Sequence, residues 1–273
     1  MSDLLADFAR ADFTHEAVTH HYYRLGSGPA VIVLAEVPGI TPKVIEFARR
    51  VAATGLTVYV PSLFGTDGAA PMPDGVGDLP RTGATWAKSL GRICVSREFT
   101  VLATGRSSPV VGWLRGLAAQ AHTECGGPGV GAVGMCVTGG FALAMAVDDR
   151  LLAPVLSQPS LPLRLTPGRK RSIDISDDDL AVVQARCARG LKVFGTRFEG
   201  DCLVPDERFA FLKDKLGAAF IDASLPADAA NPAARTPPHS VLTEHLDDRP
   251  GQRTRQTLDD VLDFLATRLE VRP

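Results

Sequence analysis

The 273-residue sequence has little of what would assign it to a membrane, secreted or nucleic-acid-binding class. No apolar run approaches the roughly 20 residues of a membrane-spanning helix. The N-terminal MSDLLADFARADF has neither a basic leader nor the apolar core of a secretory signal. Lysine and arginine form no long block, and the formal net charge is only -2. We therefore expect a protein that binds neither nucleic acid nor a membrane.

Cysteine is also scarce, and its positions fit neither a disulfide framework nor a zinc site. The five cysteines form an odd set without Cys-x-x-Cys spacing, namely Cys94, Cys125, Cys136, Cys187 and Cys202. Such a set favours a reducing compartment, and we expect a cytoplasmic protein. This matters for function because a catalytic cysteine must remain a thiol or thiolate.

What the sequence does contain is an alternation of short apolar runs and amphipathic stretches. Hydrophobic residues make up 45% and charged residues 22%, which suits a packed core, and the length suits one sizeable domain. Continuous β-branched runs such as AVIVL are typical of buried parallel strands. We predict strands at 30–34, 56–60, 130–135, 191–196 and 218–221, and helices at 42–54, 137–147, 180–188, 205–216 and 255–269. This alternation predicts an α/β fold with a mostly parallel central sheet, in a single domain covering 1–273.

Two long segments interrupt the alternation. Segment 66–80 is rich in glycine, proline and aspartate, and segment 159–179 precedes the predicted helix 180–188. Irregular segments of this length often form lids or pocket walls, so we expect both near a ligand pocket. A passive surface insertion is the alternative for each.

The strongest local motif is GMCVTGG, residues 134–140, which lies where an apolar strand turns directly into a small-residue helix. A nucleophile elbow has this arrangement, with Cys136 raised at the carboxyl edge of the sheet. The helix N-terminus favours the thiolate, and the backbone N–H of Val137 can face a developing oxyanion. Thr138 departs from the pattern, because a standard elbow has glycine there. A buried structural cysteine is the alternative.

A cysteine nucleophile needs a base, and only two histidines follow Cys136. His239 comes after two prolines in a polar loop between the last predicted strand and the last helix. His245 is surrounded by Glu244, Asp247 and Asp248, a pattern typical of a solvated surface. We therefore favour His239 as the base.

The acid of a triad in hydrolase order must lie between the nucleophile and the histidine. Asp201 fits, since LKVFGTRFEGD predicts a strand, a turn and then a carboxylate that can orient the imidazole. Asp206 and Glu199 are nearby competitors. Glu36 ends the first apolar strand, where the ligand crevice of a doubly wound sheet is expected, although an exposed strand end would look the same.

Taken together, these segments resemble the dienelactone hydrolase family. The matching segments, in order, are AVIVLAEVPGI, FARRVAATGLTVYVPSLFG, GMCVTGGFALAMA, FEGDCLVP and PPHSV. The resemblance runs from about residue 20 to residue 269, which is nearly the whole chain. The GxC elbow alone is moderately specific, whereas the segments in this order and at these separations are much more so.

The resemblance implies an α/β-hydrolase fold and hydrolysis of a small ester or lactone, of the carboxymethylenebutenolidase type, through a thioester. It places a triad on Cys136, His239 and Asp201. It also implies that Glu36 contacts the resting thiol and that the backbone N–H of Val37 is a second oxyanion donor beside that of Val137. No metal or organic cofactor is implied, and the expected partner is a small-molecule substrate.

The substrate is less well specified than the reaction. In the family, a binding arginine lies four residues after the histidine, but here that position is Thr243. Arg81 and Arg97 are the candidates for binding a substrate carboxylate, although either could be a surface residue. Two other functions stay open, a non-catalytic binding protein of the same fold and a thiol-dependent acyl transferase. An added alcohol or amine acceptor would distinguish the transferase from a hydrolase.

Overall fold

The computed structural model describes residues 3–70 and 105–271. In this part of the chain, eight strands form one sheet in the order β1-β2-β4-β3-β5-β6-β7-β8. The strands are β1 (Ala9–His15), β2 (Val18–Gly26), β3 (Ala30–Leu34), β4 (Thr57–Pro61), β5 (Val130–Met135), β6 (Leu151–Ser157), β7 (Val193–Phe198) and β8 (Phe220–Leu225). Strands β3 to β8 pair in parallel, whereas β2 pairs antiparallel with both β1 and β4. The predicted α/β class with a mostly parallel sheet is confirmed.

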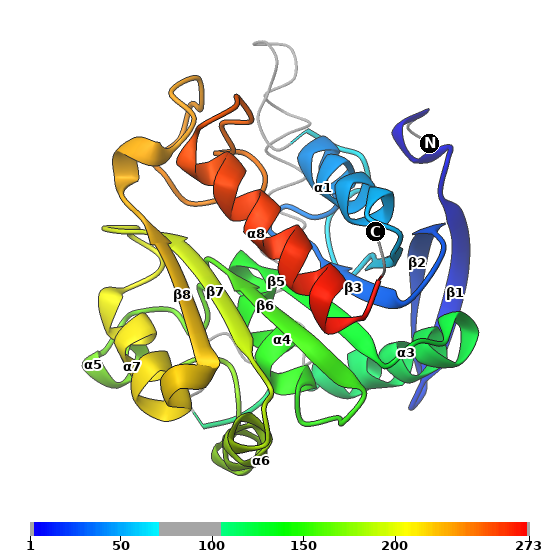
Figure 1. Ribbon diagram of the computed structural model, residues 1–273, viewed down its shortest axis with the longest axis horizontal. Coiled ribbons are helices and arrows are strands. Elements are labelled where there is room, and N and C mark those ends of the chain that lie inside the picture. The colour runs from blue at the N-terminus through cyan, green and yellow to red at the C-terminus, as the bar shows by residue number, and fades with distance from the viewer. Residues whose placement is uncertain (1–2, 71–104, 272–273) are drawn as a thin grey trace.

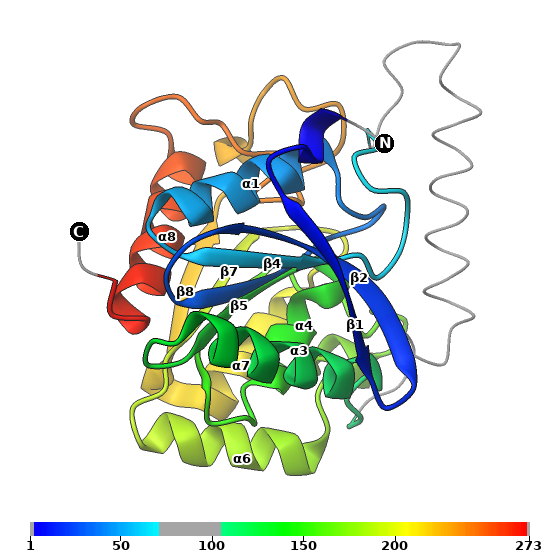
Figure 2. The ribbon, with the colours of Figure 1, turned by 90° about the vertical axis from the view of Figure 1, so that its right-hand side faces the viewer.

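Helices cover both faces of the sheet (Figures 1 and 2). One face carries α1 (Pro42–Ala53) and α8 (Arg253–Arg268); the other carries α3 (Val110–Cys125), α4 (Gly139–Met145), α6 (Asp177–Ala188) and α7 (Asp206–Leu216). Every residue of β3 is buried, and alternate side chains enter opposite cores. Ile32 packs in the core under α3 and α4, while Val31 and Val33 pack in the core under α1 and α8. The continuously apolar run AVIVL is therefore explained by burial on both sides.

The predicted strands 30–34 and 130–135 coincide with β3 and β5, and the other predicted strands lie within a few residues of β4, β7 and β8. The elements that were not predicted are strands β1, β2 and β6 and helices α3 and α5. Strand β1 is mostly exposed and lacks an apolar run, which explains why no strand pattern was visible there. That residues 1–273 form a single domain stays a prediction.

Of the two interrupting segments, 71–80 lies outside the described residues. The second, 159–179, follows the end of β6 and contains the short helix α5 (Pro167–Lys170) and the first turn of α6. Within the described ranges, no helix combines the length and apolar character needed to span a bilayer.

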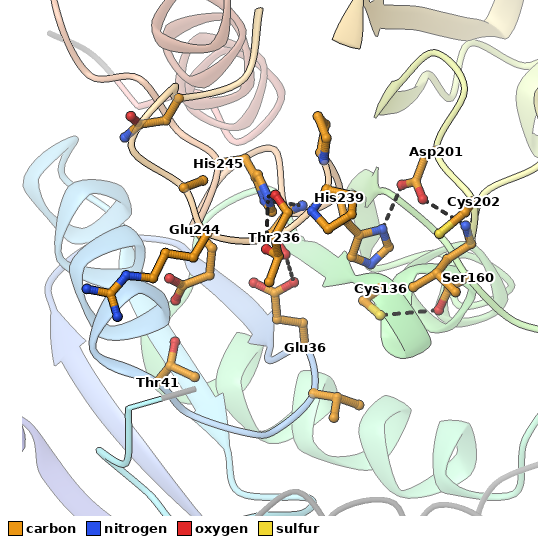
Figure 3. A pocket seen from close by; sticks show the side chains of 18 of the residues that line it. Glu36, Thr41, Cys136, Ser160, Asp201, Cys202, Thr236, His239, Glu244 and His245 are labelled. Atoms are coloured by element: carbon orange, nitrogen blue, oxygen red, sulfur yellow. Dashed lines mark hydrogen bonds and ion pairs between the residues drawn. The ribbon is translucent and has the colours of Figure 1, made fainter. Parts of the chain in front are cut away.

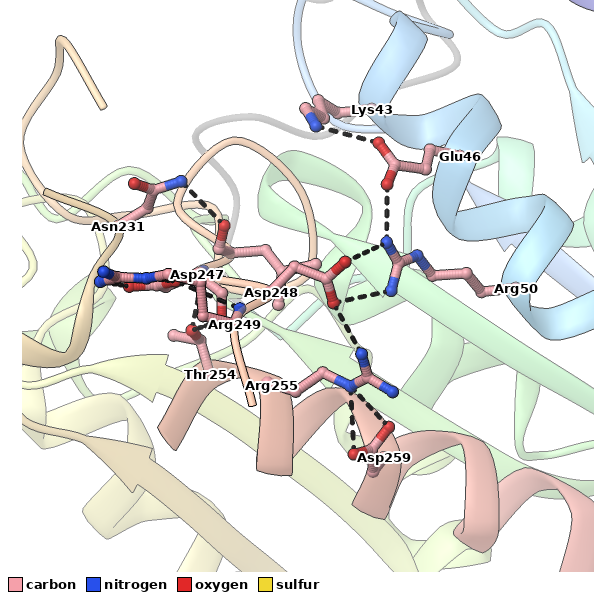
Figure 4. A network of polar contacts seen from close by, with 11 residues as sticks. Lys43, Glu46, Arg50, Asn231, Asp247, Asp248, Arg249, Thr254, Arg255 and Asp259 are labelled. Carbon is pink, nitrogen blue, oxygen red and sulfur yellow. Dashed lines mark hydrogen bonds and ion pairs between the residues drawn. The ribbon is translucent and has the colours of Figure 1, made fainter. Parts of the chain in front are cut away.

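The chain between β8 and α8 is connected to α1 by a polar network on the surface (Figure 4). Arg50 of α1 contacts Asp248 at 2.7 Å and Glu46 at 2.7 Å, and Arg255 of α8 contacts Asp248 at 3.0 Å. Exposed ion pairs of this kind contribute little stability each. Their position matters more, because the long segment that they hold carries His239.

Candidate active site

Cys136 lies at the sharp turn between β5 and a 3-10 turn, Cys136–Thr138, that leads into α4. Its φ of 54° is in the left-handed region, a conformation that costs a non-glycine residue about 1–3 kcal/mol and is concentrated at functional sites. The turn is so tight that a Cβ on Gly134 would lie 2.3 Å from the carbonyl oxygen of Thr138. Glycine two residues before the cysteine is therefore required by the local backbone.

The departure at Thr138 has a structural explanation. This residue has a φ of -91°, which any amino acid can adopt, so glycine is not needed there. Its hydroxyl accepts a hydrogen bond from Met135 N at 2.9 Å and lies 3.1 Å from the carbonyl oxygen of Leu34. Thr138 thus connects the ends of β5 and β3 on either side of the elbow. After the cysteine, the backbone requires glycine at Gly139 instead, where a Cβ would lie 2.6 Å from Cα of Pro159.

Asp201 and His239 form a close pair beside the cysteine (Figure 3). Asp201 stands in the turn after β7, and its Oδ2 lies 2.6 Å from Nδ1 of His239. The other carboxylate oxygen accepts from Leu203 N at 2.8 Å, which fixes the side chain. Among the described residues, Nε2 of His239 is buried without a hydrogen-bond partner. The structure therefore brings together the three residues of the predicted triad.

The electrostatics of the site favour a protonated imidazole. Burial lowers the pKa of His239, but the electrostatic interaction with the nearby Cys136 and the hydrogen bond to Asp201 outweigh burial. The pKa of His239 is consequently held well above its usual 6.5. Such a histidine stabilises a thiolate beside it, as a cysteine nucleophile requires.

The alternative candidates for the base and the acid, His245, Asp206 and Glu199, make other contacts. The prediction that His245 is solvated is wrong, since it is 2% exposed. Its Nδ1 accepts from Ser240 N at 3.1 Å, and its Nε2 lies 3.0 Å from the Thr236 carbonyl oxygen, so the ring braces the loop that carries His239. Burial lowers the pKa of His245. Asp206 pairs with Arg197, and Glu199 is exposed.

Glu36 is buried at the end of β3 and faces the cavity. Three side chains donate to its carboxylate, namely Ser240 at 2.6 Å, Gln158 at 3.2 Å and Thr243. Among the described residues, the thiol of Cys136 makes its side-chain hydrogen bond with Ser160 instead, at 3.2 Å. The contact between Glu36 and the thiol that the resemblance implies is not made in this conformation.

These residues surround a cavity of about 630 Å³. Val37 and Val137, the expected oxyanion donors, line it together with Cys136. Glu244 also lines it, and burial, followed by the negative charge of Glu36, raises the pKa of Glu244 to about 7. Oε1 of Glu244 is buried without a partner among the described residues.

The two arginines predicted to bind a substrate carboxylate, Arg81 and Arg97, lie outside the described residues. Within the described residues, the arginine that lines the cavity is the exposed Arg235. The described residues include no group of three or more His, Cys, Asp or Glu side chains that could hold a metal ion.

The sequence analysis did not identify Ser160 and Glu244 as residues of the site. Ser160 lies 24 residues beyond Cys136 in an irregular segment, so no local pattern marks it.

Comparisons with known proteins agree with this architecture. The model of the dienelactone hydrolase family matches residues 19–171, and the search of curated proteins found no significant match. The α/β hydrolase GrgF from Penicillium sp. sh18 is 14% identical with a TM-score of 0.58, covering 96% of this chain and 99% of that one. A dienelactone hydrolase-like promiscuous phosphotriesterase from metagenomic libraries is 16% identical with a TM-score of 0.52, covering 96% and 98%. The 2,6-dihydroxy-pseudo-oxynicotine hydrolase is 15% identical with a TM-score of 0.59, covering 97% and 70%. At these identities, the solved structures establish the fold.

Proposed function

The chain belongs to the dienelactone hydrolase family, and we propose that it hydrolyses a small ester or lactone with Cys136 as nucleophile, a reaction of the carboxymethylenebutenolidase type. One observation carries the proposal: the buried Asp201–His239 pair lies beside a strained cysteine, and all three residues line one cavity. The family match ends at residue 171, so it includes Cys136 but neither member of that pair. The geometry therefore supports the triad independently of the match.

The reaction begins from a thiolate on Cys136 beside an imidazolium, with the proton of the thiol on Nε2 of His239. The sulfur attacks the carbonyl carbon, and the oxyanion accepts hydrogen bonds from the backbone N–H groups of Val37 and Val137. One such donor contributes roughly 3–4 kcal/mol in related chemistry. As the carbon–oxygen bond breaks, the imidazolium gives its proton to the departing alkoxide or enolate, and a thioester remains.

In the second half, neutral His239 removes a proton from water, and the resulting hydroxide attacks the thioester. The second tetrahedral intermediate uses the same oxyanion donors and collapses to a carboxylic acid and the thiolate, which regains its proton. Asp201 holds the imidazole in the tautomer with the proton on Nδ1 and stabilises the cation. No step in this sequence requires a redox or metal cofactor.

The hydrogen bonds of Glu36 in this structure differ from the contact with the thiol that the resemblance implies. For its carboxylate to activate the thiol, as the resemblance implies, it must leave the donors Ser240, Thr243 and Gln158. We propose that substrate binding brings about that exchange. Arg81 and Arg97 remain our candidates for a substrate carboxylate, and Thr243 cannot take that part while it donates to Glu36.

A reducing compartment such as the cytoplasm remains part of the proposal. In the described part of the chain, Cys125, Cys136, Cys187 and Cys202 are all free thiols, which supports it. The nucleophile needs this state, because oxidation of the thiol would remove its reactivity.

The test is hydrolysis of a short-chain aryl ester and of a dienelactone by the wild type, Cys136→Ala and Cys187→Ala, all kept reduced. Cys187 is a half-buried thiol on α6 and serves as the matched control. We expect Cys136→Ala to lose about 10³-fold or more in turnover and Cys187→Ala to match the wild type. Equal turnover by all three proteins would refute the cysteine mechanism.

A further inference from the structure

The hydroxyl group of Ser160 makes a hydrogen bond with the thiol of the proposed nucleophile. Its Oγ lies 3.2 Å from Sγ of Cys136, within the distance expected for a hydrogen bond to sulfur (Figure 3). Ser160 is only 3% exposed and lines the same cavity as Cys136 and His239. The contact is therefore in the reaction centre and shielded from bulk water.

Backbone contacts hold Ser160 in place on the elbow. Its N–H donates to the carbonyl oxygen of Cys136 at 2.9 Å, so the residue contacts the nucleophile through both main chain and side chain. The preceding Pro159 packs on Gly139 so closely that a Cβ on the glycine would lie 2.6 Å from Cα of the proline. The backbone consequently holds the Ser160 hydroxyl in a fixed position beside the Cys136 thiol.

Arg208 binds the backbone of the segment 159–172, which includes Ser160. This arginine of α7 is fully buried, and within the described residues its four hydrogen bonds all go to backbone carbonyl oxygens. It donates to Pro159 at 2.7 Å, Pro162 at 2.5 Å and Ser172 at 2.8 Å. Burial lowers the pKa of Arg208 to about 10, which reflects the cost of an internal cation without a carboxylate. A buried guanidinium used in this way fixes the geometry of the chain around Ser160.

Among the described residues, the carboxylate of Glu36 accepts from Ser240, Thr243 and Gln158, and no hydrogen bond joins it to the thiol. We propose that Ser160 is a catalytic residue whose hydroxyl orients the Cys136 thiol and then donates a hydrogen bond to the thiolate. The proposal rests on Cys136 being the nucleophile. In the conformation without substrate, Ser160 occupies the position at the sulfur that the resemblance gives to Glu36.

The proton positions follow from the geometry. In the resting thiol, either group can donate across the 3.2 Å contact. When the thiol proton moves to Nε2 of His239, the sulfur becomes an acceptor only, and the O–H of Ser160 turns to donate to it. Hydrogen bonds to charged groups are stronger than neutral ones, so this contact favours the thiolate over the thiol.

The pH dependence of Cys136 alkylation tests the proposal directly. The full-length wild type, Ser160→Ala and Ser172→Ala are treated with iodoacetamide between pH 5 and 10, and the Cys136 peptide is quantified by mass spectrometry. Ser172 lies in the same segment, where its hydroxyl donates to the Arg169 carbonyl oxygen, and it serves as the matched control. We expect the midpoint for Ser160→Ala to rise by roughly one pH unit or more. Ser172→Ala should keep the wild-type midpoint.

A second pair of variants protects the test against misfolding. Ser160→Thr and Ser160→Val have nearly the same shape and differ in the hydroxyl, so a wild-type midpoint in the first and a raised midpoint in the second would support the proposal. An unchanged midpoint in folded Ser160→Ala or Ser160→Val, with the wild type active on esters, would overturn the role of Ser160 alone. If wild-type Cys136 is alkylated no faster than Cys187 and no ester is hydrolysed, the proposed function itself fails.

Discussion

Ser240 donates its hydroxyl proton to Glu36 across 2.6 Å, which connects the end of the central strand β3 to the residue that follows His239. Thr243 donates to the other carboxylate oxygen of Glu36, and Gln158, at the end of β6, donates to the same oxygen as Ser240. A single buried carboxylate thus joins three segments that surround Cys136. Any motion of Glu36 toward the thiol must be coupled to the loop that carries His239.

Glu36→Gln tests this coupling. The substitution keeps the shape but removes the charge and turns one acceptor into a donor, so at least one of the three hydrogen bonds is lost. We expect the free energy of unfolding to fall by about 1–3 kcal/mol and kcat/KM to fall at least about ten-fold. Chemical denaturation and ester hydrolysis measure the two effects.

Glu46→Gln is the matched control, since Glu46 lies on the exposed face of α1 and contacts Lys43 and Arg50. Its effect on unfolding should stay below about 1 kcal/mol. If Glu36→Gln behaved like this surface variant in both assays, the carboxylate would have no part in the site.

The raised pKa of His239 predicts where activity is lost on the alkaline side. With an alkyl ester, whose leaving group needs a proton, activity should persist well above pH 6.5 and fall as the pH rises through the raised pKa. Asp201→Asn removes a charge that favours the imidazolium, so the alkaline limb should move to lower pH. Turnover should also fall by about 10²–10⁴-fold. A pH–rate profile with an unmoved alkaline limb would contradict the proposed pairing.

Glu244 predicts a pH effect on stability rather than on chemistry. Its pKa rises from 4.5 in the unfolded chain to about 7 in the folded one, so between these values the folded state binds the extra proton. The contribution of Glu244 to stability is therefore lost as the pH rises from about 4.5 to about 7. Glu244→Gln should raise Tm relative to the wild type at pH 8 and leave it nearly unchanged at pH 4. A constant difference between the two proteins at both pH values would contradict the assignment.

The elbow could be predicted from sequence because its determinants are local. A strand of six buried residues, a required glycine at 134 and small residues after the cysteine all lie within one short segment. The order of nucleophile, acid and histidine along the chain then limited the remaining choices. These features depend on local backbone geometry, and local sequence patterns predict such geometry well.

The partners of Glu36 and Cys136 could not be predicted in the same way. Ser160 reaches the thiol only because the segment after β6 returns over the elbow, held by Arg208 from α7. His245 looked solvated because its sequence neighbours are acidic, whereas the loop folds its ring inward onto Ser240 and Thr236. Contacts between segments that are distant in the sequence determine where these side chains lie, and no local sequence pattern reveals such contacts.

Thr138 provides a test of the elbow's architecture. Thr138→Val removes the hydroxyl that accepts from Met135 N and contacts the carbonyl oxygen of Leu34, and it leaves the shape almost unchanged. We expect a loss of about 1–3 kcal/mol in unfolding free energy, because a buried N–H loses its acceptor. Thr123→Val is the control, since that hydroxyl is exposed on α3 and bonds only within its own helix. Equal stability of the two variants would show that Thr138 contributes nothing specific.

The central claim is that the acyl group is carried by Cys136, and trapping the intermediate tests it most directly. The reduced wild type is mixed with a short-chain aryl ester, quenched in acid within the first turnover and digested for peptide mass spectrometry. We predict an acyl adduct on the Cys136 peptide that neutral hydroxylamine removes, as expected for a thioester, and its absence from Cys136→Ala. Full turnover by Cys136→Ala, or an adduct on another residue with Cys136 unmodified, would contradict the account.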